Sequence, residues 1–307
     1  MHAESAVQRP RVGYLGPAGT FTEEALRHSA RAGELQEVAL PGIYDTVLAL
    51  RRGEVEWAVV PIENSLEGSV TVTLDLLADQ LGDLEIVGEA LIAVRHALIA
   101  AEPLALSEID TVITHPQVPG QCTRLLRGEL AHARVLPASS TAEAVRLVAD
   151  GHEPGAAAIG TRLAADIYRG TVVREGVQDR DDNVTRFVWL GRADRSPAQP
   201  PPLRGGEQEG GPGDGGGPGW KTSVVFWGAG ADSPGWLVRC LDQFARRAIN
   251  LTKIESRPQR ARLGHYVFFV DLQGGMGDPV VAEALAGVRA VCEEARILGS
   301  YRAVVDP

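Results

Sequence analysis

Residues 196–219 constrain the fold of this chain more than any other segment, because they carry too little apolar surface to join a core. They read SPAQPPPLRGGEQEGGPGDGGGPG, with 9 Gly and 6 Pro in 24 residues. A segment of this composition cannot bury apolar area and is typical of a linker. As a Gly-rich coil it would span roughly 27 Å. The 307-residue chain is therefore predicted to form two units, residues 10–195 and 220–307, joined by the linker 196–219.

The composition argues against a nucleic-acid or membrane partner. Hydrophobic residues make up 44% and charged residues 23%, as in globular proteins. The formal net charge is −10, and Lys and Arg are scattered singly rather than gathered on a basic face. No segment approaches the ~18 apolar residues of a membrane helix, and the N-terminus lacks an apolar run of signal-peptide length. We therefore expect a cytoplasmic protein.

Neither the cysteines nor the histidines are spaced as metal ligands. The three cysteines are far apart and odd in number, which suggests free, mostly buried thiols. None of the seven histidines has a His or Cys partner at ligand spacing, so we expect no metal site. The sequence also lacks a Walker loop and a G-x-S-x-G nucleophile turn.

Residues 10–195 alternate between strand-like and helix-like stretches. RVGYLG is strand-like and FTEEALRHSA is helix-like, and WAVVPIE and VTLDLLADQL repeat that order. The alternation continues from TVITHP to AAAIG. It predicts an α/β architecture with largely parallel sheets, which could form two lobes if the chain crosses out and returns.

Residues 220–307 follow a strand–helix–strand–strand–helix–strand order. This is the βαββαβ arrangement of ferredoxin-like folds. The first predicted helix spans residues 233–249, and five apolar residues fall on one face of it at i, i+4, i+7, i+8 and i+11: Leu237, Leu241, Phe244, Ala245 and Ala248.

Three segments of the first unit place small polar residues directly after a predicted strand. Thr20 with Glu23, in GPAGTFTEEA, and Ser140 with Glu143, in SSTAEA, both match a capping box. In ENSLEGSV, Asn64 follows the strand WAVVPIE. Ligands of α/β folds collect at the carboxyl ends of strands, where helix N-termini offer free N–H groups. The three turns together indicate an anion-binding site, although each alone is typical of an ordinary helix start.

A fourth polar segment, THPQVPGQC, also ends a predicted strand and carries His115 and Gln117. A lone His at such a place is usually structural, since Pro116 can begin a helix at its favoured first position.

Taken together, these segments resemble one known family. GPAGTFTEEA, PIENSLEGSV, THPQVPGQC, SSTAEA and DDNVTRF resemble, in this order, the motifs of the prephenate dehydratases. In the second unit, PGWL and NLTKIESRP resemble the C-terminal ACT regulatory domain of that family. The similarity covers nearly the whole chain outside the linker.

The resemblance implies a carbon–oxygen lyase that converts prephenate to phenylpyruvate, with loss of water and carbon dioxide, in phenylalanine synthesis. It implies a catalytic domain of two α/β lobes, like the type II periplasmic binding proteins, followed by the ferredoxin-like ACT domain. It also implies regulation by L-phenylalanine, assembly as a homodimer or homotetramer, and no organic cofactor or metal.

The resemblance assigns the decisive role to Thr185, in TRF. A threonine hydroxyl has too high a pKa for an ordinary general acid, so we expect it to donate a hydrogen bond to the leaving oxygen. Neighbours on a strand point to opposite faces, so Arg186 would face away from Thr185 unless the strand ends there. The candidate catalytic residues are Thr185, Asn64 and Ser65. The candidate substrate-binding residues are Thr20, Phe21, Gln117, Ser139, Ser140, Thr141, Asn183, Arg186 and Phe187.

In the second unit, Ser233 is a predicted N-cap and Pro234 a predicted first helical residue, so the N–H groups that follow could bind an amino-acid carboxylate. The candidate effector-binding residues are Gly235, Trp236, Leu237, Asn250, Leu251, Glu255 and Ser256, with the site completed across a subunit interface. The chain has Trp236 where the family usually has Ala, and its linker is longer and richer in Gly than is typical.

Two other functions fit the same motifs. An arogenate dehydratase would take the aminated analogue of prephenate, and the motifs do not distinguish an amine from a keto group. A non-catalytic amino-acid sensor would also combine a binding-protein-like first unit with an ACT module, although the presence of Thr185 favours an enzyme.

Overall fold

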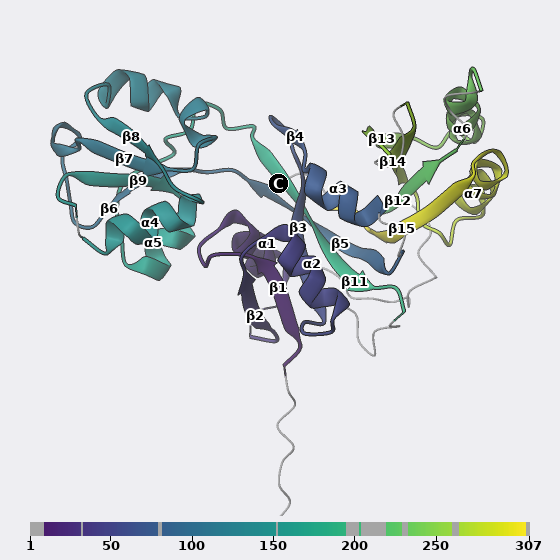
Figure 1. Cartoon of the computed structure of the whole chain (residues 1–307), viewed down its shortest axis with the longest axis horizontal. Helices are drawn as coiled ribbons and strands as arrows, with labels where there is room; N and C mark the ends of the chain where they lie inside the picture. Colours follow the sequence, from purple (N-terminus) through teal and green to yellow (C-terminus); the bar gives the residue numbers. More distant parts are fainter. Residues whose placement is uncertain are drawn as a thin grey trace, which may run out of the picture.

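The computed structural model of the chain describes residues 9–31, 33–78, 82–151, 153–194, 203, 219–228, 233–259 and 264–304. Within these ranges the chain forms three sheets, and Figure 1 shows the first lobe lying between the second lobe and the C-terminal unit. The predicted linker 196–219 lies outside the described residues except for Leu203 and Gly219.

The first lobe is built on a six-stranded sheet in the order β2-β1-β3-β11-β5, with β4 paired to β3. Its strands are β1 (Arg11–Leu15), β2 (Gln36–Leu40), β3 (Trp57–Asn64), β4 (Gly68–Ser69), β5 (Leu84–Ala93) and β11 (Val184–Arg192). Its helices are α1 (Phe21–Ser29), α2 (Ile43–Arg51) and α3 (Thr71–Ala78). Both sides of the sheet are buried, since one apolar cluster contains Val60 and Val188 and the other Val59 and Trp189.

The second lobe is built on a five-stranded sheet in the order β10-β6-β9-β7-β8. Its strands are β6 (Ala97–Ala100), β7 (Thr111–Thr114), β8 (Arg134–Pro137), β9 (Ala156–Gly160) and β10 (Thr171–Glu175). Its helices are α4 (Thr141–Ala149) and α5 (Arg162–Tyr168), with short helical turns η1 (Leu106–Glu108), η2 (Val118–Gly120) and η3 (Leu125–Glu129).

The sheet of each lobe mixes parallel and antiparallel pairs, so the prediction of largely parallel sheets in residues 10–195 was wrong. β1, β2 and β3 are parallel in the first lobe, and β7, β8 and β9 are parallel in the second. Apart from the short strand β4, which pairs antiparallel with β3, the antiparallel pairs involve the strands of the two crossings between the lobes. The chain leaves through β5 and β6 and returns through β10 and β11, so each returning strand runs against the strand that left. Periodicity does not report strand direction, so the sequence carried no signal for this reversal.

The C-terminal unit has the ferredoxin-like strand order β13-β14-β12-β15, as its βαββαβ pattern predicted. Its elements are β12 (Trp220–Trp227), α6 (Trp236–Ala245), β13 (Leu251–Pro258), β14 (Tyr266–Gln273), α7 (Pro279–Val291) and β15 (Glu294–Arg302). One face of the sheet, with Phe226 and Val270, packs in a cluster with residues of α6 and α7.

The opposite face of that sheet packs on the first lobe. Val225, Phe269 and Tyr301 share one apolar cluster with Leu74 of α3 and Ile86 of β5. The approach is close at β15, because a Cβ on Gly299 would lie 2.0 Å from the backbone oxygen of Ile86. The C-terminal unit and the first lobe therefore share a continuous core.

Helix α6 differs from its predicted form. It ends at Ala245, and Ala248 lies beyond it, exposed and with a positive φ of 54°. Its buried residues are Trp236, Cys240 and Phe244, one turn apart, so the buried stripe is rotated from the predicted one. The bulk of Trp236 explains the rotation, because the indole fills the core beside Phe226 and Phe268.

Two further predictions concern buried apolar groups. The linker was predicted to bury no apolar area, but Leu203 packs against the cluster that contains Tyr14 and Trp189 and pairs with Ala30, so this prediction was wrong at one residue. The cysteines are free as predicted; Cys122 and Cys240 are buried and Cys292 is half-buried.

Candidate functional site

Thr185 and Asn64 meet because the returning strand β11 pairs with the end of β3. β11 begins at Val184 and runs antiparallel to β3, which places Thr185 opposite Asn64. The Asn64 Nδ2 donates a hydrogen bond to the Thr185 Oγ1 at 2.9 Å. Both side chains are half-buried. The pair thus lies where the chain re-enters the first lobe from the second.

The orientation of the Asn64 amide is fixed by its neighbours. Its Oδ1 accepts from the backbone N–H groups of Leu66 and Glu67, each at 2.9 Å. Because an amide oxygen only accepts, the Nδ2 must be the atom that faces Thr185 and the Asn183 Oδ1, 2.8 Å away.

This orientation decides what Thr185 can do. Its oxygen already accepts a hydrogen bond from Asn64, so its own hydroxyl proton is left to be donated elsewhere. In the described part of the chain no acceptor for that proton is found. A donor positioned in this way can stabilise negative charge that develops on a leaving oxygen.

Side chains of the second lobe extend this contact into a polar cluster, which we call the Thr185 cluster and define as Asn64, His96, Gln121, Asn183 and Thr185. The Asn183 Nδ2 lies 3.3 Å from the Gln121 Oε1. The same Oε1 lies 3.0 Å from the His96 Nε2. The cluster therefore joins residues of both lobes.

His96 enters the cluster as a neutral base. It is 2% exposed, and burial lowers its pKa although the hydrogen bond with Gln121 opposes that shift. Its Nδ1 is buried and has no hydrogen-bond partner among the described residues. The Nε2 therefore carries the proton and donates to Gln121, while Nδ1 is unprotonated.

The glycine turn before α1 also touches the second lobe. The Thr161 hydroxyl donates to the carbonyl of Gly19 at 2.6 Å, and the Tyr168 hydroxyl donates to the carbonyl of Ala18 at 2.8 Å. Phe21, at the start of α1, meets the His96 ring edge-on with the centroids 5.6 Å apart. The segment GPAGTF thus lies at the same boundary between the lobes as the Thr185 cluster.

The capping predictions are partly confirmed. The Thr20 and Ser140 hydroxyls accept from the backbone N–H groups of Glu23 and Glu143. The Glu23 carboxylate accepts from the Gly19 N–H rather than from that of the cap residue. Glu143 pairs with Arg146 instead of returning to its cap.

Several predicted site residues occupy other positions. The Ser65 hydroxyl bonds with backbone groups of Asp182 and Val184, and so holds the start of β11. Phe187 is 2% exposed in the apolar cluster beneath α1. Gln117 is exposed, whereas Gln121, four residues later on the same turn, reaches the Thr185 cluster. The hydrogen bonds of the described residues do not connect this cluster with Ser139, Ser140 or Thr141, which precede or open α4.

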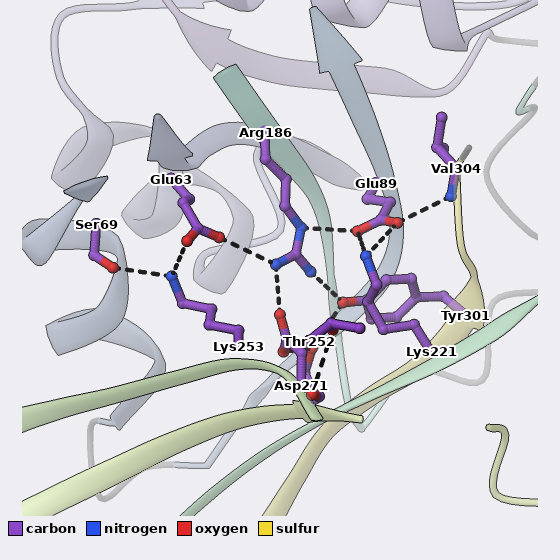
Figure 2. A network of polar contacts seen from close by, with 11 residues as sticks. Glu63, Ser69, Glu89, Arg186, Lys221, Thr252, Lys253, Asp271, Tyr301 and Val304 are labelled. Atoms are coloured by element: carbon purple, nitrogen blue, oxygen red, sulfur yellow. Dashed lines mark hydrogen bonds and ion pairs between the residues drawn. The ribbon is translucent and has the colours of Figure 1, made fainter. Parts of the chain in front are cut away.

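Arg186 points away from Thr185, as alternation along a strand predicts, and the structure does not bring it into the Thr185 cluster. Its side chain is 9% exposed. Its Nε donates to the Glu89 Oε2 at 2.8 Å, its Nη2 donates to the Tyr301 hydroxyl at 2.7 Å, and its Nη1 pairs with Asp271 (Figure 2). Burial would lower the pKa of Arg186, but Tyr301 and the carboxylates of Asp271 and Glu89 raise it above its ordinary value.

A second candidate site is a pocket of about 390 Å³ on the C-terminal unit. It lies beside the start of α6 and is lined there by Ser233, Pro234, Gly235, Trp236 and Leu237. Val238, Tyr266 and Phe268 add apolar walls. Three of the predicted effector residues are therefore brought together, whereas Asn250, Leu251, Glu255 and Ser256 do not line this pocket.

The helix start at this pocket differs from the prediction. The N-cap is Gly235, with a positive φ of 76°, and α6 begins at Trp236 rather than at Pro234. The Ser233 hydroxyl accepts from Arg239 instead of capping the helix. The Trp236 indole N–H donates to the carbonyl of Val291 at 2.7 Å, so the indole is held in the core and forms the floor of the pocket.

Two structural absences can be stated for the residues that the structure describes. No helix among them is long and apolar enough to cross a membrane. No group of three or more His, Cys, Asp or Glu residues among them is arranged to hold a metal ion.

Comparisons with known proteins agree with the motifs. A family model described as "Prephenate dehydratase" matches residues 12–195. A prephenate dehydratase of Mycolicibacterium vanbaalenii is 37% identical over 306 residues, which cover 95% of this chain and 91% of the relative. The crystal structure of a prephenate dehydratase from Arthrobacter aurescens in complex with L-Phe has a TM-score of 0.81 at 36% identity, covering 97% of this chain and 93% of that one.

A further solved structure, described as "GqqA- a novel type of quorum quenching acylases", has a TM-score of 0.80 at 28% identity and covers 96% of this chain and 98% of that one. The family match spans more than half of the chain, and the curated relative is matched over nearly its whole length. This chain belongs to the prephenate dehydratase family.

Proposed function

We propose that this chain converts prephenate to phenylpyruvate, with loss of water and carbon dioxide, in phenylalanine synthesis. The observation that carries the proposal is the hydrogen bond from Asn64 to Thr185 at the boundary between the lobes. It leaves one hydroxyl proton to be donated, and it occurs in a chain of the prephenate dehydratase family.

The reaction needs little acid–base catalysis from the protein. Prephenate carries two carboxylates and a ring hydroxyl, and loss of that hydroxyl together with CO2 makes the ring aromatic, which supplies the driving force. The Thr185 hydroxyl donates to the leaving oxygen as the C–O bond breaks, and Asn64 supports the partial negative charge on the Thr185 oxygen. The neutral His96 keeps Gln121 in place rather than transferring a proton.

The substrate carboxylates need donors, which helix starts can provide. The N-terminus of α1 follows the glycine turn and carries Thr20 and Phe21, and that of α4 carries Ser140 and Thr141. Free backbone N–H groups and the positive end of a helix dipole favour an anion at such places. We assign substrate binding to these two helix starts and to Asn183 and Gln121. Arg186 is left out of the assignment because its guanidinium is engaged by protein groups.

The direct test is an assay of phenylpyruvate formation, by its absorbance in alkali, with prephenate and with arogenate as separate substrates. We expect kcat/KM for prephenate to exceed that for arogenate. Faster turnover of arogenate would make the chain an arogenate dehydratase, and no turnover of either substrate would favour the amino-acid sensor.

We further propose that the C-terminal unit is an ACT domain and that its pocket binds L-phenylalanine. Apolar walls from Trp236, Phe268 and Tyr266 suit an aromatic side chain, and the free N–H groups at the start of α6 suit its carboxylate. A relative of similar structure is described in complex with L-Phe, which supports the proposal.

The remaining effector residues, Asn250, Leu251, Glu255 and Ser256, lie on or next to the edge strand β13. Because they do not line the pocket of their own chain, we propose that a second copy brings them to it, in a homodimer or homotetramer.

Calorimetry with phenylalanine tests the regulatory proposal separately from the activity. Gly235→Val should weaken binding at least tenfold, because a β-branched residue does not readily adopt the φ of 76° while space for the side chain is available there. Turnover in the absence of phenylalanine should change less than twofold. Absence of phenylalanine binding to the wild-type protein would reject the proposal.

A further inference from the structure

Six charged residues meet between the first lobe and the C-terminal unit, and we call them the interdomain charge cluster. Glu63, Glu89 and Arg186 come from the first lobe, and Lys221, Lys253 and Asp271 from the C-terminal unit (Figure 2). Lys221 pairs with Glu89 at 2.8 Å and Lys253 with Glu63 at 3.1 Å. Arg186 pairs with Glu89 and Asp271, and its Nη1 lies 3.7 Å from Glu63.

The formal net charge of the interdomain charge cluster is zero, but the charges from the first lobe alone, or from the C-terminal unit alone, do not cancel. The first lobe contributes two carboxylates and one guanidinium, and the C-terminal unit contributes two ammonium groups and one carboxylate. Each side therefore carries one uncompensated charge that only the other side neutralises. The Glu89 side chain is fully buried, so separating the two parts would leave unpaired charges at a formerly dry surface.

Hydrogen bonds make the position of Arg186 dependent on the C-terminal unit. Ser223 donates to Asp271, so its oxygen is left to accept from the Tyr301 hydroxyl. The Tyr301 oxygen in turn accepts from Arg186. Burial raises the pKa of Tyr301, which keeps this hydroxyl protonated and able to donate. Two of the three nitrogens of the guanidinium are thus held by residues of β14 and β15.

The interdomain charge cluster lies directly behind the Thr185 cluster. Across β11 and β3, Thr185 pairs with Asn64 and Arg186 pairs with Glu63. Because adjacent residues of a strand face opposite sides, one pair faces the substrate site and the next pair faces the C-terminal unit. The pairing is irregular between Arg186 and Phe187, so these two pairs are separated from the rest of the ladder.

We propose that Arg186 is a positioning residue through which the C-terminal unit sets the geometry of the Asn64–Thr185 hydrogen bond. Arg186 and Glu63 are held by Asp271, Tyr301 and Lys253, and each is covalently next to one partner of that hydrogen bond. A shift of the C-terminal sheet moves the ends of β3 and β11 and with them the Thr185 hydroxyl. The proposal rests on the proposed dehydratase function and names the route by which an effector of the C-terminal unit reaches the site.

Asp271→Asn tests the proposal without removing bulk from the core. It is nearly isosteric, lies on the C-terminal unit, and removes the charge that holds Arg186 from that side. The matched control is Asp75→Asn, which weakens another ion pair between the same two parts, Asp75 with Arg257 at 3.1 Å, but on α3 and not next to the catalytic pair. We expect kcat for phenylpyruvate formation to fall at least tenfold in Asp271→Asn with KM within threefold, and kcat to change less than twofold in Asp75→Asn.

Hydrogen exchange gives a readout that does not depend on activity. Peptides that cover residues 60–66 and 182–188 should exchange at least fivefold faster in Asp271→Asn than in the wild type, and at the wild-type rate in Asp75→Asn. Equal exchange of these peptides in both variants would overturn the proposal, even if the wild-type protein turned over no prephenate. If the wild type is active and the two variants have equal kcat values, the proposal is overturned as well, and the dehydratase function is left intact.

Discussion

At the Asn64–Thr185 contact an amide nitrogen donates to a hydroxyl oxygen, and the direction of this bond determines which proton remains for a substrate. Asn64→Asp reverses that direction while keeping the shape of the side chain. The carboxylate would still accept hydrogen bonds from the backbone N–H groups of Leu66 and Glu67, but it would also accept a hydrogen bond from the Thr185 hydroxyl. We expect kcat to fall by about 100-fold, as when one donor of an oxyanion site is lost. Steady-state kinetics of the two proteins measure this, and a kcat within threefold of the wild-type value would contradict it.

A second prediction at the residue scale concerns His96. Its folded pKa lies below the ordinary value of 6.5, so below pH 6.5 the unfolded chain binds a proton that the folded chain resists. The free energy of unfolding should therefore fall as the pH drops below about 6.5, by up to about 1.4 kcal/mol per pH unit from this one group. Urea unfolding between pH 7 and pH 5 should show a smaller fall for His96→Gln. Parallel pH profiles for the two proteins would show that His96 is not the group responsible.

The sequence identified some residues of the Thr185 cluster but not all of them. Asn64 was named because it follows a predicted strand, whereas Thr185 and Asn183 were named because DDNVTRF resembles a motif of the family. In THPQVPGQC, Gln117 was named rather than Gln121, because Gln121 becomes a neighbour of this site only when the lobes meet. His96 lies in none of the motifs and follows Arg95 in the short connection between two strands. Arg186 was ambiguous for another reason: a guanidinium suits a substrate carboxylate as well as the carboxylates of a second unit, and the sequence does not show which is present.

Among the elements, the turn before α1 depends most on one residue. Gly19 has a φ of 88°, and a Cβ there would lie 2.7 Å from the Cα of Ala164 in the second lobe. Gly33→Ala is a matched control, since Gly33 has a φ of 79° and nothing lies within 4 Å of a Cβ added there. Both substitutions carry the backbone cost of about 1–2 kcal/mol, but only Gly19→Ala should also separate the lobes and raise KM at least tenfold. Equal KM values in the two variants would argue against a contact between this turn and α5 in solution.

The order and type of most helices and strands could be predicted from local sequence patterns, but the direction of some strands and the start of one helix could not. The fold of the C-terminal unit, β12 to β15, was predicted because strands and helices differ in the period of their apolar residues. The order of these elements along the chain is typical of a ferredoxin-like fold. The direction of β5 and β11 was missed because it depends on the chain crossing twice between lobes. The start of helix α6 was placed two residues too early, since Ser233 and Pro234 resemble a helix start while the positive φ at Gly235 is set by the turn that precedes the helix.

For the molecule as a whole, the close contact between β15 and β5 leaves no room for a side chain. A Cβ on Gly299 would lie 2.0 Å from the Ile86 carbonyl oxygen, and backbone cannot move aside as a side chain can. We expect Gly299→Ala to lower stability by about 1–3 kcal/mol, the usual range for overpacking, and to lower kcat by loosening the interdomain charge cluster. Gly120→Ala is the control, because nothing lies within 4 Å of a Cβ there. An unchanged Tm and kcat in Gly299→Ala would mean that the two parts do not pack in solution as described.

The sequence predicted two units but not that they share a core. A linker rich in Gly and Pro suggests loose coupling, whereas Val225 and Phe269 pack in one cluster with residues of α3 and β5. These residues alternate along their strands in the same way as residues that face the core of their own domain. The pattern therefore indicates that they are buried, but not that they are buried against another domain. That the face of the C-terminal sheet with Val225 and Phe269 packs on the first lobe could be learned only from the structure.

The role of the Thr185 hydroxyl is tested most directly by kcat for phenylpyruvate formation in wild type, Thr185→Ala and Thr185→Ser. We predict at least a 100-fold fall in kcat for Thr185→Ala with KM within threefold, because the hydroxyl acts on the transition state and not on the bound substrate. Thr185→Ser, which keeps the hydroxyl, should retain at least a tenth of the wild-type kcat. A Thr185→Ala variant that forms phenylpyruvate within twofold of the wild-type rate would contradict this role.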